Sequence, residues 1–201
     1  MSEKKENFNE ITGETAVFLD RDGTINSAGT GQYITRWQQF EFLPGVPGAL
    51  AALAKLPVKI FVVTNQSAVH RDMMTVSDLE LIHGRMEFEI VSAGGRIDGL
   101  KYCPHAPREK CYCRKPKSLL YSELAKEHAL ELKNSFNVGD HTRDMQAGHV
   151  FGMTNILVRT GLGKMSEMSL KSSEHIVDHV VDDLPKAVEI IESILNERAK
   201  L

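Results

Sequence analysis

Short apolar runs alternate with helical patterns along most of the chain, and this alternation limits the possible folds more than any other feature. Six runs predict β-strands, at residues 16–19, 58–63, 97–102, 136–138, 155–158 and 176–181. The first five are almost continuously apolar, as is typical of strands covered on both faces. Helices are expected at 47–56, 75–93 and 118–130, and after the last strand from about residue 183. The pattern predicts an α/β fold, a doubly wound parallel sheet with helices on both faces.

Two of these helices have recognisable first turns. Thr75 and Asp78 have the spacing of a capping box, and the helix that they open is expected to stop at the glycine pair that follows residue 93. Asp183 is the expected N-cap of the last helix, with Pro185 in the first turn.

The length, charge and hydropathy of the chain favour a single globular domain in an aqueous environment. We expect residues 1–13 to form a polar tail and residues 14–201 a single domain, because no repeat or linker divides them. The net charge of −3 gives no basic field for nucleic acid or an anionic membrane. No stretch reaches the roughly 18 apolar residues of a membrane span. The protein is therefore expected to be cytoplasmic and monomeric, with neither nucleic acid nor membrane as a partner.

Two carboxylates follow the first predicted strand directly. Asp20 comes at its carboxyl end, Asp22 two residues later, and Gly23 allows a sharp turn. Ligands of open parallel sheets bind outside these strand ends. Carboxylates this close repel one another unless a cation lies between them, and oxygen ligands favour Mg²⁺. On its own, the motif could also be a solvated Asp-x-Asp-Gly turn.

Polar residues follow the other strands as well. The second ends at Thr64 and Asn65, whose hydroxyl and amide groups suit phosphate oxygens. After the third come Arg114 and Lys115, and the fourth is followed by Asp140. Because parallel strands end at one edge of a sheet, these groups are expected to meet there and form a phosphoryl-transfer site.

In their order along the chain, these residues resemble the four motifs of the haloacid dehalogenase phosphatases, and the resemblance spans about residues 14 to 195. It implies that Asp20 is a nucleophile that forms an aspartyl-phosphate and that Asp22 is the general acid and base. By the same resemblance, Thr64 and Lys115 hold the phosphoryl oxygens, and Asp20, Asp22 and Asp140 bind Mg²⁺.

All three cysteines lie in one short stretch, together with a histidine. Cys103, His105, Cys111 and Cys113 match the ligand set of a closed tetrahedral zinc site. A disulfide is the weaker alternative, because neighbours in Cys-x-Cys bridge poorly and one thiol would be left over. Since Arg114 and Lys115 follow Cys113 directly, a structural Zn²⁺ here would brace the loop that carries these two side chains.

The substrate is expected to be a small phosphorylated metabolite. Two branches of the superfamily are similar to the chain: heptose bisphosphate phosphatases of lipopolysaccharide or nucleotide-heptose biosynthesis, and histidinol-phosphate phosphatases of histidine biosynthesis. The heptose branch is favoured by the segments FLDRDGTIN, VVTNQS, LVRTGLG and VVDDLPKAVEII. Arg114 also favours it, because its guanidinium could bind a second phosphate. A remote alternative is a non-catalytic, zinc-stabilised binding protein.

The gaps between motifs are too short for the cap domains of this superfamily, so a capless site is expected. Loops must then provide specificity, chiefly residues 27–42, in which Tyr33 and Trp37 could face the substrate or pack elsewhere. His141 and Asp144 follow Asp140 closely, and the sequence assigns neither a role.

Overall fold

The six predicted strands form one parallel sheet in the computed structural model, which describes residues 13–28, 31–170 and 175–200. Its strands are β1 (Ala16–Leu19), β2 (Lys59–Asn65), β3 (Gly99–Cys103), β4 (Phe136–Gly139), β5 (Thr154–Val158) and β6 (His179–Val181). They lie in the order β3-β2-β1-β4-β5-β6, and every pairing is parallel. The order reverses direction between β1 and β4, which is where ligands bind in folds of this type. The predicted α/β fold class is confirmed.

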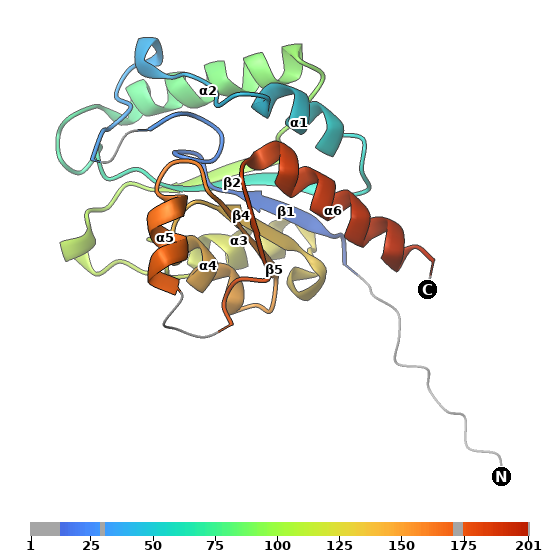
Figure 1. Cartoon of the computed structure of the whole chain (residues 1–201). Helices are drawn as coiled ribbons and strands as arrows, with labels where there is room; N and C mark the ends of the chain where they lie inside the picture. The colour runs from blue at the N-terminus through green and yellow to red at the C-terminus, as the bar shows by residue number, and fades with distance from the viewer. Residues whose placement is uncertain (1–12, 29–30, 171–174, 201) are drawn as a thin grey trace.

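Helices cover both faces of the sheet. They are α1 (Val46–Leu53), α2 (Val76–Ser92), α3 (Leu119–His128), α4 (Thr142–His149), α5 (Gly163–Leu170) and α6 (Leu184–Arg198). Figure 1 shows α1, α2 and α6 above the sheet, with α3, α4 and α5 below it. Three short 3-10 helices, Trp37–Gln39, Pro107–Glu109 and Leu132–Asn134, lie in the connections.

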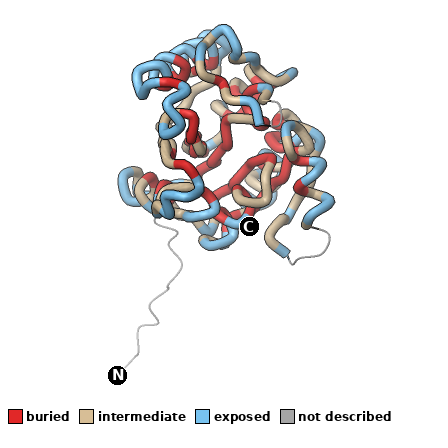
Figure 2. Tube along the Cα trace, turned by 90° about the vertical axis from the view of Figure 1, so that its left-hand side faces the viewer, coloured by how far each residue is buried: buried red, intermediate tan, exposed pale blue. Residues whose placement is uncertain are grey.

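Strand β1 shows why the sheet must be covered twice. Val17 and Leu19 belong to the apolar cluster with α1, α2 and α6, whereas Ala16 and Phe18 belong to the cluster with α3 and α4. Successive side chains of a strand point to opposite faces, so a continuously apolar strand feeds two cores. The buried trace accordingly runs through the middle of the molecule (Figure 2).

Several boundaries differ from those predicted. β2 extends through Thr64 and Asn65, because their backbones pair with Tyr102 and Cys103 although the apolar run has ended. α5 was not predicted, since its sequence GKMSEMSL has no apolar stripe. The expected first turns are confirmed: Thr75 and Asp78 form a capping box, and Asp183 caps α6. The predicted tail, residues 1–13, lies outside the described residues except for Gly13.

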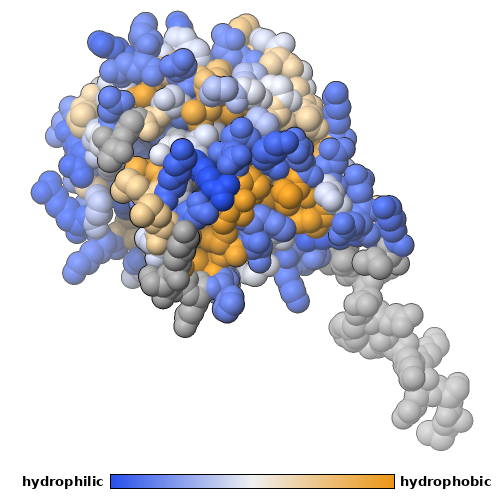
Figure 3. Space-filling view, viewed as in Figure 1, coloured by the Kyte–Doolittle hydropathy of each residue, from blue (hydrophilic) through white to orange (hydrophobic). Residues whose placement is uncertain are grey.

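No separate cap is present in the described part of the chain. Between Asp22 and Thr64 lie a 3-10 helix and α1, apart from residues 29–30, which are not described, and α2 and β3 precede Lys115. α1 and α2 both pack into the sheet's own core. The described residues include no helix long and apolar enough to cross a membrane. The face seen in Figure 3 is largely hydrophilic, with smaller apolar areas between the polar side chains.

Candidate active site

Three aspartates meet at the carboxyl edge of the sheet, where β1 and β4 lie side by side. Asp20 follows β1, Asp140 follows β4, and Asp144 is in the first turn of α4. Their carboxylate oxygens lie within 4.8 Å of one another, and all three residues are buried. Such a group of charges needs a cation nearby.

Lys115 supplies one positive charge. Its Nζ lies 2.9 Å from Oδ1 of Asp20 and 2.8 Å from Oδ1 of Asp144, and it donates to the backbone oxygen of Val63 at 2.6 Å. Burial acts to lower the pKa of Lys115, but the carboxylates of Asp144 and Asp20 outweigh it and raise the pKa. Lys115 is therefore charged at neutral pH, as the predicted phosphoryl contact requires.

One ammonium does not neutralise the group. Burial, together with the charges of Asp20 and Asp144, raises the pKa of Asp140 to about 8. Oδ2 of Asp140 accepts a hydrogen bond from the backbone of Leu162 at 2.8 Å, whereas the buried Oδ1 has no hydrogen-bond partner among the described residues. A buried, unpartnered carboxylate oxygen beside other carboxylates fits a divalent cation such as Mg²⁺.

Two glycines frame Asp140. A Cβ atom on Gly23 or on Gly161 would lie 2.1 Å from Oδ2 of Asp140, and both glycines have positive φ angles, of 86° and 54°. Larger residues would therefore displace the carboxylate. Thr160 adds a hydrogen bond from its Oγ1 to the backbone oxygen of Gly23 at 2.6 Å. The turn after β1 and the loop after β5 thus position the carboxylate from opposite sides.

Asp22 has different surroundings. Its Oδ1 and Oδ2 accept hydrogen bonds from Arg21 at 2.8 and 2.9 Å, and Gln66 and Asn26 donate to it at 2.8 and 3.1 Å. Burial acts to raise the pKa of Asp22, but the charge of Arg21 and these hydrogen bonds lower it. Asp22 lines the same cavity as Asp20, yet it is not part of the three-carboxylate group.

The polar end of β2 serves two purposes. Thr64 is buried, lines the cavity and accepts a hydrogen bond from Gln66 at 2.9 Å. Asn65 also lines the cavity, but its amide binds both backbone groups of Lys115: Oδ1 accepts from the N–H at 3.0 Å, and Nδ2 donates to the carbonyl at 3.2 Å. The contacts therefore make Asn65 a holder of the Lys115 backbone, and substrate binding by its side chain stays a prediction.

A cavity of about 210 Å³ is lined by Asp20, Asp22, Thr64, Asn65 and Asp140. Arg114, which was predicted to bind substrate, lines it, and so does Arg143 of α4, which was not predicted. Within the part of the chain that the structure describes, the buried Nε of Arg143 has no hydrogen-bond partner. Burial, and the nearby charge of Arg143, lower the pKa of Arg114. Two like charges held beside one cavity favour an anionic ligand.

The loop aromatics have separate positions. Tyr33 lines the cavity. Trp37 is not among the lining residues; its ring stacks on Phe40, with ring centres 4.9 Å apart, and packs against the core. His141 caps α4 by accepting the backbone N–H of Arg143 at Nδ1, at 3.2 Å. No local sequence pattern distinguishes Arg143 from an exposed helical arginine, so only the packing of α4 reveals it.

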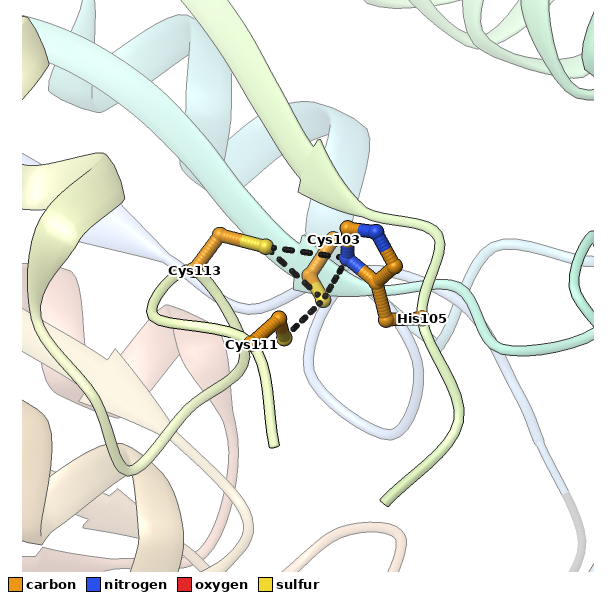
Figure 4. Close-up of side chains that lie close together, drawn as sticks. All are labelled: Cys103, His105, Cys111 and Cys113. Atoms are coloured by element: carbon orange, nitrogen blue, oxygen red, sulfur yellow. Dashed lines mark hydrogen bonds between the residues drawn. The ribbon is translucent and has the colours of Figure 1, made fainter. Parts of the chain in front are cut away.

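The cysteine–histidine cluster lies just beyond β3 (Figure 4). Sγ of Cys103 is 3.6 Å from Nδ1 of His105, 3.6 Å from Sγ of Cys111 and 3.2 Å from Sγ of Cys113, and the last sulfur is 3.2 Å from His105. Ligands of a tetrahedral zinc ion lie about 3.5–3.8 Å apart, close to these values. A disulfide sulfur pair would be about 2.05 Å apart, so that alternative is excluded. The four side chains could hold one metal ion.

This cluster is directly tied to the cavity. Arg114 follows Cys113, and its side chain donates to the backbone oxygen of His105 at 3.1 Å. The carbonyl belongs to one of the four cluster residues, so the loop and the arginine hold each other in place.

Comparisons with known proteins agree with this geometry. A HAD-hydrolase-like family model matches residues 112–187. The chain is 36% identical over 169 residues to the D-glycero-alpha-D-manno-heptose-1,7-bisphosphate 7-phosphatase of Mycobacterium bovis, which covers 84% of this chain and 86% of the relative. It is 38% identical over 151 residues to the D-glycero-beta-D-manno-heptose-1,7-bisphosphate 7-phosphatase of Helicobacter pylori, with 75% and 86% covered.

Among solved structures, a crystal structure of D,D-heptose 1,7-bisphosphate phosphatase from B. bronchiseptica, complexed with magnesium and phosphate, is similar with a TM-score of 0.83. It is 30% identical, and the match covers 89% of this chain and 98% of that one. Fold and relatives together define the class: the protein is a phosphatase of the haloacid dehalogenase (HAD) type, which confirms that prediction and rules out the non-catalytic alternative. Within this class, the chain belongs to the family of heptose-1,7-bisphosphate 7-phosphatases.

Proposed function

We propose that the protein removes the 7-phosphate from D-glycero-D-manno-heptose 1,7-bisphosphate, through an aspartyl-phosphate on Asp20. The observation that carries this proposal is the position of Asp20 at the switch point of the sheet, beside Lys115 and Asp140. Both contacts of the Asp20 carboxylate are made by Oδ1, from the backbone N–H of Arg21 at 2.8 Å and from Lys115. Oδ2 is then the oxygen available to attack phosphorus.

The two steps require one nucleophile and one proton carrier. In the first, Oδ2 of Asp20 bonds to phosphorus, the bond from phosphorus to the sugar oxygen breaks, and Asp22 gives that oxygen a proton. In the second, Asp22 takes a proton from water, whose oxygen attacks the same phosphorus and releases inorganic phosphate from Asp20. Because Arg21 lowers the pKa of Asp22, that carboxylate must take up a proton with the substrate, and the negative charge of the phosphate favours this.

Mg²⁺ is the proposed catalytic cofactor, with Asp20, Asp22 and Asp140 as its predicted ligands. Asp20 and Asp140 belong to the three-carboxylate group, whereas Asp22 is held by Arg21. When bound, the ion offsets carboxylate repulsion and stabilises charge on the phosphoryl group. Thr64 and Lys115 are the proposed donors to the phosphoryl oxygens, and Asp144 holds the Lys115 ammonium in place.

The second phosphate is the proposed ligand of Arg114 and Arg143. Both line the cavity, and neither is paired with a carboxylate in the described ion pairs. Histidinol phosphate, the alternative substrate, carries cationic groups and no second phosphate. The positive charges of Arg114 and Arg143 therefore disfavour its binding. Both named relatives act on a heptose 1,7-bisphosphate, one on the alpha and the other on the beta form.

Zn²⁺ is the proposed occupant of the cysteine–histidine cluster, with a structural role. Four protein ligands leave no coordination position for substrate or water. The hydrogen bond from Arg114 to His105 supports a brace for the substrate-binding loop. We further propose that the enzyme acts as a cytoplasmic monomer on this soluble sugar bisphosphate, in lipopolysaccharide or nucleotide-heptose biosynthesis.

One comparison of rates tests the substrate. With Mg²⁺ present, kcat/KM is measured for the alpha and beta heptose 1,7-bisphosphates and for histidinol phosphate. A heptose bisphosphate should have the highest value. A higher value for histidinol phosphate would reject the proposed substrate and leave the HAD mechanism intact.

A further inference from the structure

A buried arginine separates the two aspartates of the first motif. Arg21 is 0% exposed, and its guanidinium makes three hydrogen bonds to Asp22: from Nε at 3.2 Å and from the NH2 nitrogen at 2.8 and 2.9 Å. A fully buried guanidinium has to place all its N–H groups on acceptors, because an unmet donor in the interior is unfavourable. Asp22 thus accepts hydrogen bonds from Nε and NH2, on one side of the forked guanidinium group.

The third nitrogen of the guanidinium, NH1, has a hydrogen-bond partner on α2. The NH1 nitrogen of Arg21 lies 3.0 Å from Nε2 of His83, which is in α2 and 62 residues away in the sequence. An arginine can only donate, so Nε2 must be the acceptor and the ring must be neutral. Burial, with the nearby charge of Arg21, lowers the pKa of His83 to about 3, in agreement with a neutral ring.

His83 is itself held firmly. It is buried, its neighbours Leu79 and Ile82 belong to the apolar cluster between α2 and the loop after β1, and its ring packs on that of Tyr102 at 5.7 Å between centres. The core of the protein therefore sets the orientation of His83, His83 sets that of Arg21, and Arg21 sets that of Asp22.

We propose that Arg21 and His83 are positioning residues, which hold the carboxylate of Asp22 in the orientation from which it exchanges a proton with the leaving oxygen. A simple counter-ion would not need this arrangement, since an ammonium would neutralise Asp22 without defining its rotation. The Arg21 guanidinium, held by His83, fixes the positions of both carboxylate oxygens of Asp22. Proton transfer depends on such alignment. The inference rests on the proposed role of Asp22 as general acid.

The leaving group provides a readout that a structural role would not affect. An alkoxide leaves only with a proton, whereas p-nitrophenolate is stable without one. The first step, which kcat/KM reports, should therefore need Asp22 for an alkyl phosphate and much less for p-nitrophenyl phosphate. A partly unfolded enzyme would lose activity towards both esters by the same factor.

The test compares His83→Leu with His83→Gln, whose amide oxygen can still accept the Arg21 hydrogen bond. With Mg²⁺ and whichever alkyl phosphate the unaltered enzyme hydrolyses, His83→Leu should lose about tenfold to a hundredfold in kcat/KM. For p-nitrophenyl phosphate the loss should stay below about threefold, and His83→Gln should restore most of the alkyl activity. Ile82→Val, a change at a buried apolar residue of the same helix, should leave the ratio of kcat/KM for the two substrates unchanged.

Asp22→Asn is the reference, because it removes the proton carrier itself. Asp22→Asn should lower kcat/KM for the alkyl ester more than for p-nitrophenyl phosphate. If it does, and His83→Leu lowers kcat/KM for both esters by the same factor, the positioning role is wrong and the proposed function stands. Should Asp22→Asn show no selectivity at saturating Mg²⁺, where a weakened metal site is still filled, the proposed acid role fails first. If His83→Leu does not fold, Arg21→Lys, which keeps the charge but loses the fork, must show the same selective loss or the inference is rejected.

Discussion

The ammonium of Lys115 and the carboxylate of Asp144 form an ion pair of 2.8 Å in which both side chains are only 1% exposed. The pair joins the loop between β3 and α3 to the first turn of α4, and it also fixes the lysine beside Asp20. A buried charge that loses its partner is strongly destabilising.

We therefore expect Asp144→Asn to lower the free energy of unfolding by about 2 kcal/mol and to reduce kcat, because Lys115 would lose one of its two carboxylates. Urea unfolding and steady-state kinetics measure the two effects. Glu189→Gln, which removes the partner of the exposed Lys186, is the control and should change stability by less than about 0.5 kcal/mol. Equal changes in the free energy of unfolding for the two variants would contradict a stabilising role for the buried Lys115–Asp144 pair.

Asp20→Asn should abolish turnover, since an amide cannot form the aspartyl-phosphate. Asp22→Asn should reduce kcat by about 10²–10⁴-fold, the usual contribution of general acid–base catalysis. Hydrolysis of an alkyl phosphate ester in the presence of Mg²⁺ provides the measurement, and circular dichroism checks the fold. Activity of the Asp20 variant near that of the unaltered enzyme would exclude the proposed nucleophile.

One zinc ion per chain is expected by elemental analysis of protein purified without chelator. Cys111→Ser should lose the metal and unfold at a lower temperature, because binding of a structural zinc contributes to folding. The matched control is Tyr112→Ala, an exposed side chain between two predicted ligands, which should retain the zinc. Protein that lacks zinc and is fully stable would refute this prediction.

Removal of either cavity arginine should affect the bisphosphate selectively. We expect Arg114→Ala and Arg143→Ala each to lower kcat/KM for the heptose bisphosphate about tenfold to a hundredfold, as for one lost charge-assisted contact. A sugar monophosphate should lose much less. Arg108→Ala, a change at an exposed arginine in the loop between His105 and Cys111, serves as the control. Equal losses on both substrates would mean that the arginines serve the transferred phosphate.

The raised pKa of Asp140 predicts a pH dependence of stability in protein without Mg²⁺. This carboxyl has a pKa of about 8 in the folded protein against 3.8 ordinarily, so the folded state holds the proton more tightly. Its contribution is present at low pH and is lost as the pH rises towards 8, by at most about 1.4 kcal/mol per pH unit. Urea unfolding between about pH 5 and 8, in protein dialysed free of Mg²⁺, measures the slope. Added Mg²⁺, or the Asp140→Asn variant, should flatten it.

Most of the architecture could be predicted because it depends on composition along the chain. Continuous apolar runs require a sheet covered on both faces, and parallel strands bring their carboxyl ends to one edge, so Asp20, Thr64 and Asp140 were expected together. Ligand spacing likewise indicated the cysteine–histidine cluster. These inferences need only the order of residues and the geometry of the backbone.

The rest depends on the directions of side chains, which packing decides. Arg143 reaches the cavity because of the way α4 docks, and His83 meets Arg21 across 62 residues. Asn65 stands where a substrate-binding amide was expected, yet its hydrogen bonds are used by Lys115. α5 lacks the apolar stripe that would have revealed it.

The contact between Gly23 and the loop after β5 has a consequence for synthesis of the protein. On the ribosome, β1 emerges before β5, but Asp140 accepts a hydrogen bond from Leu162, in the loop at residues 160–162 that Thr160 joins to the turn after β1. A nascent chain that ends before this loop contains all the proposed phosphoryl-contacting residues without the frame that aligns them. Activity should therefore appear late and abruptly during translation, and truncated chains should be inert although most of their sheet is present.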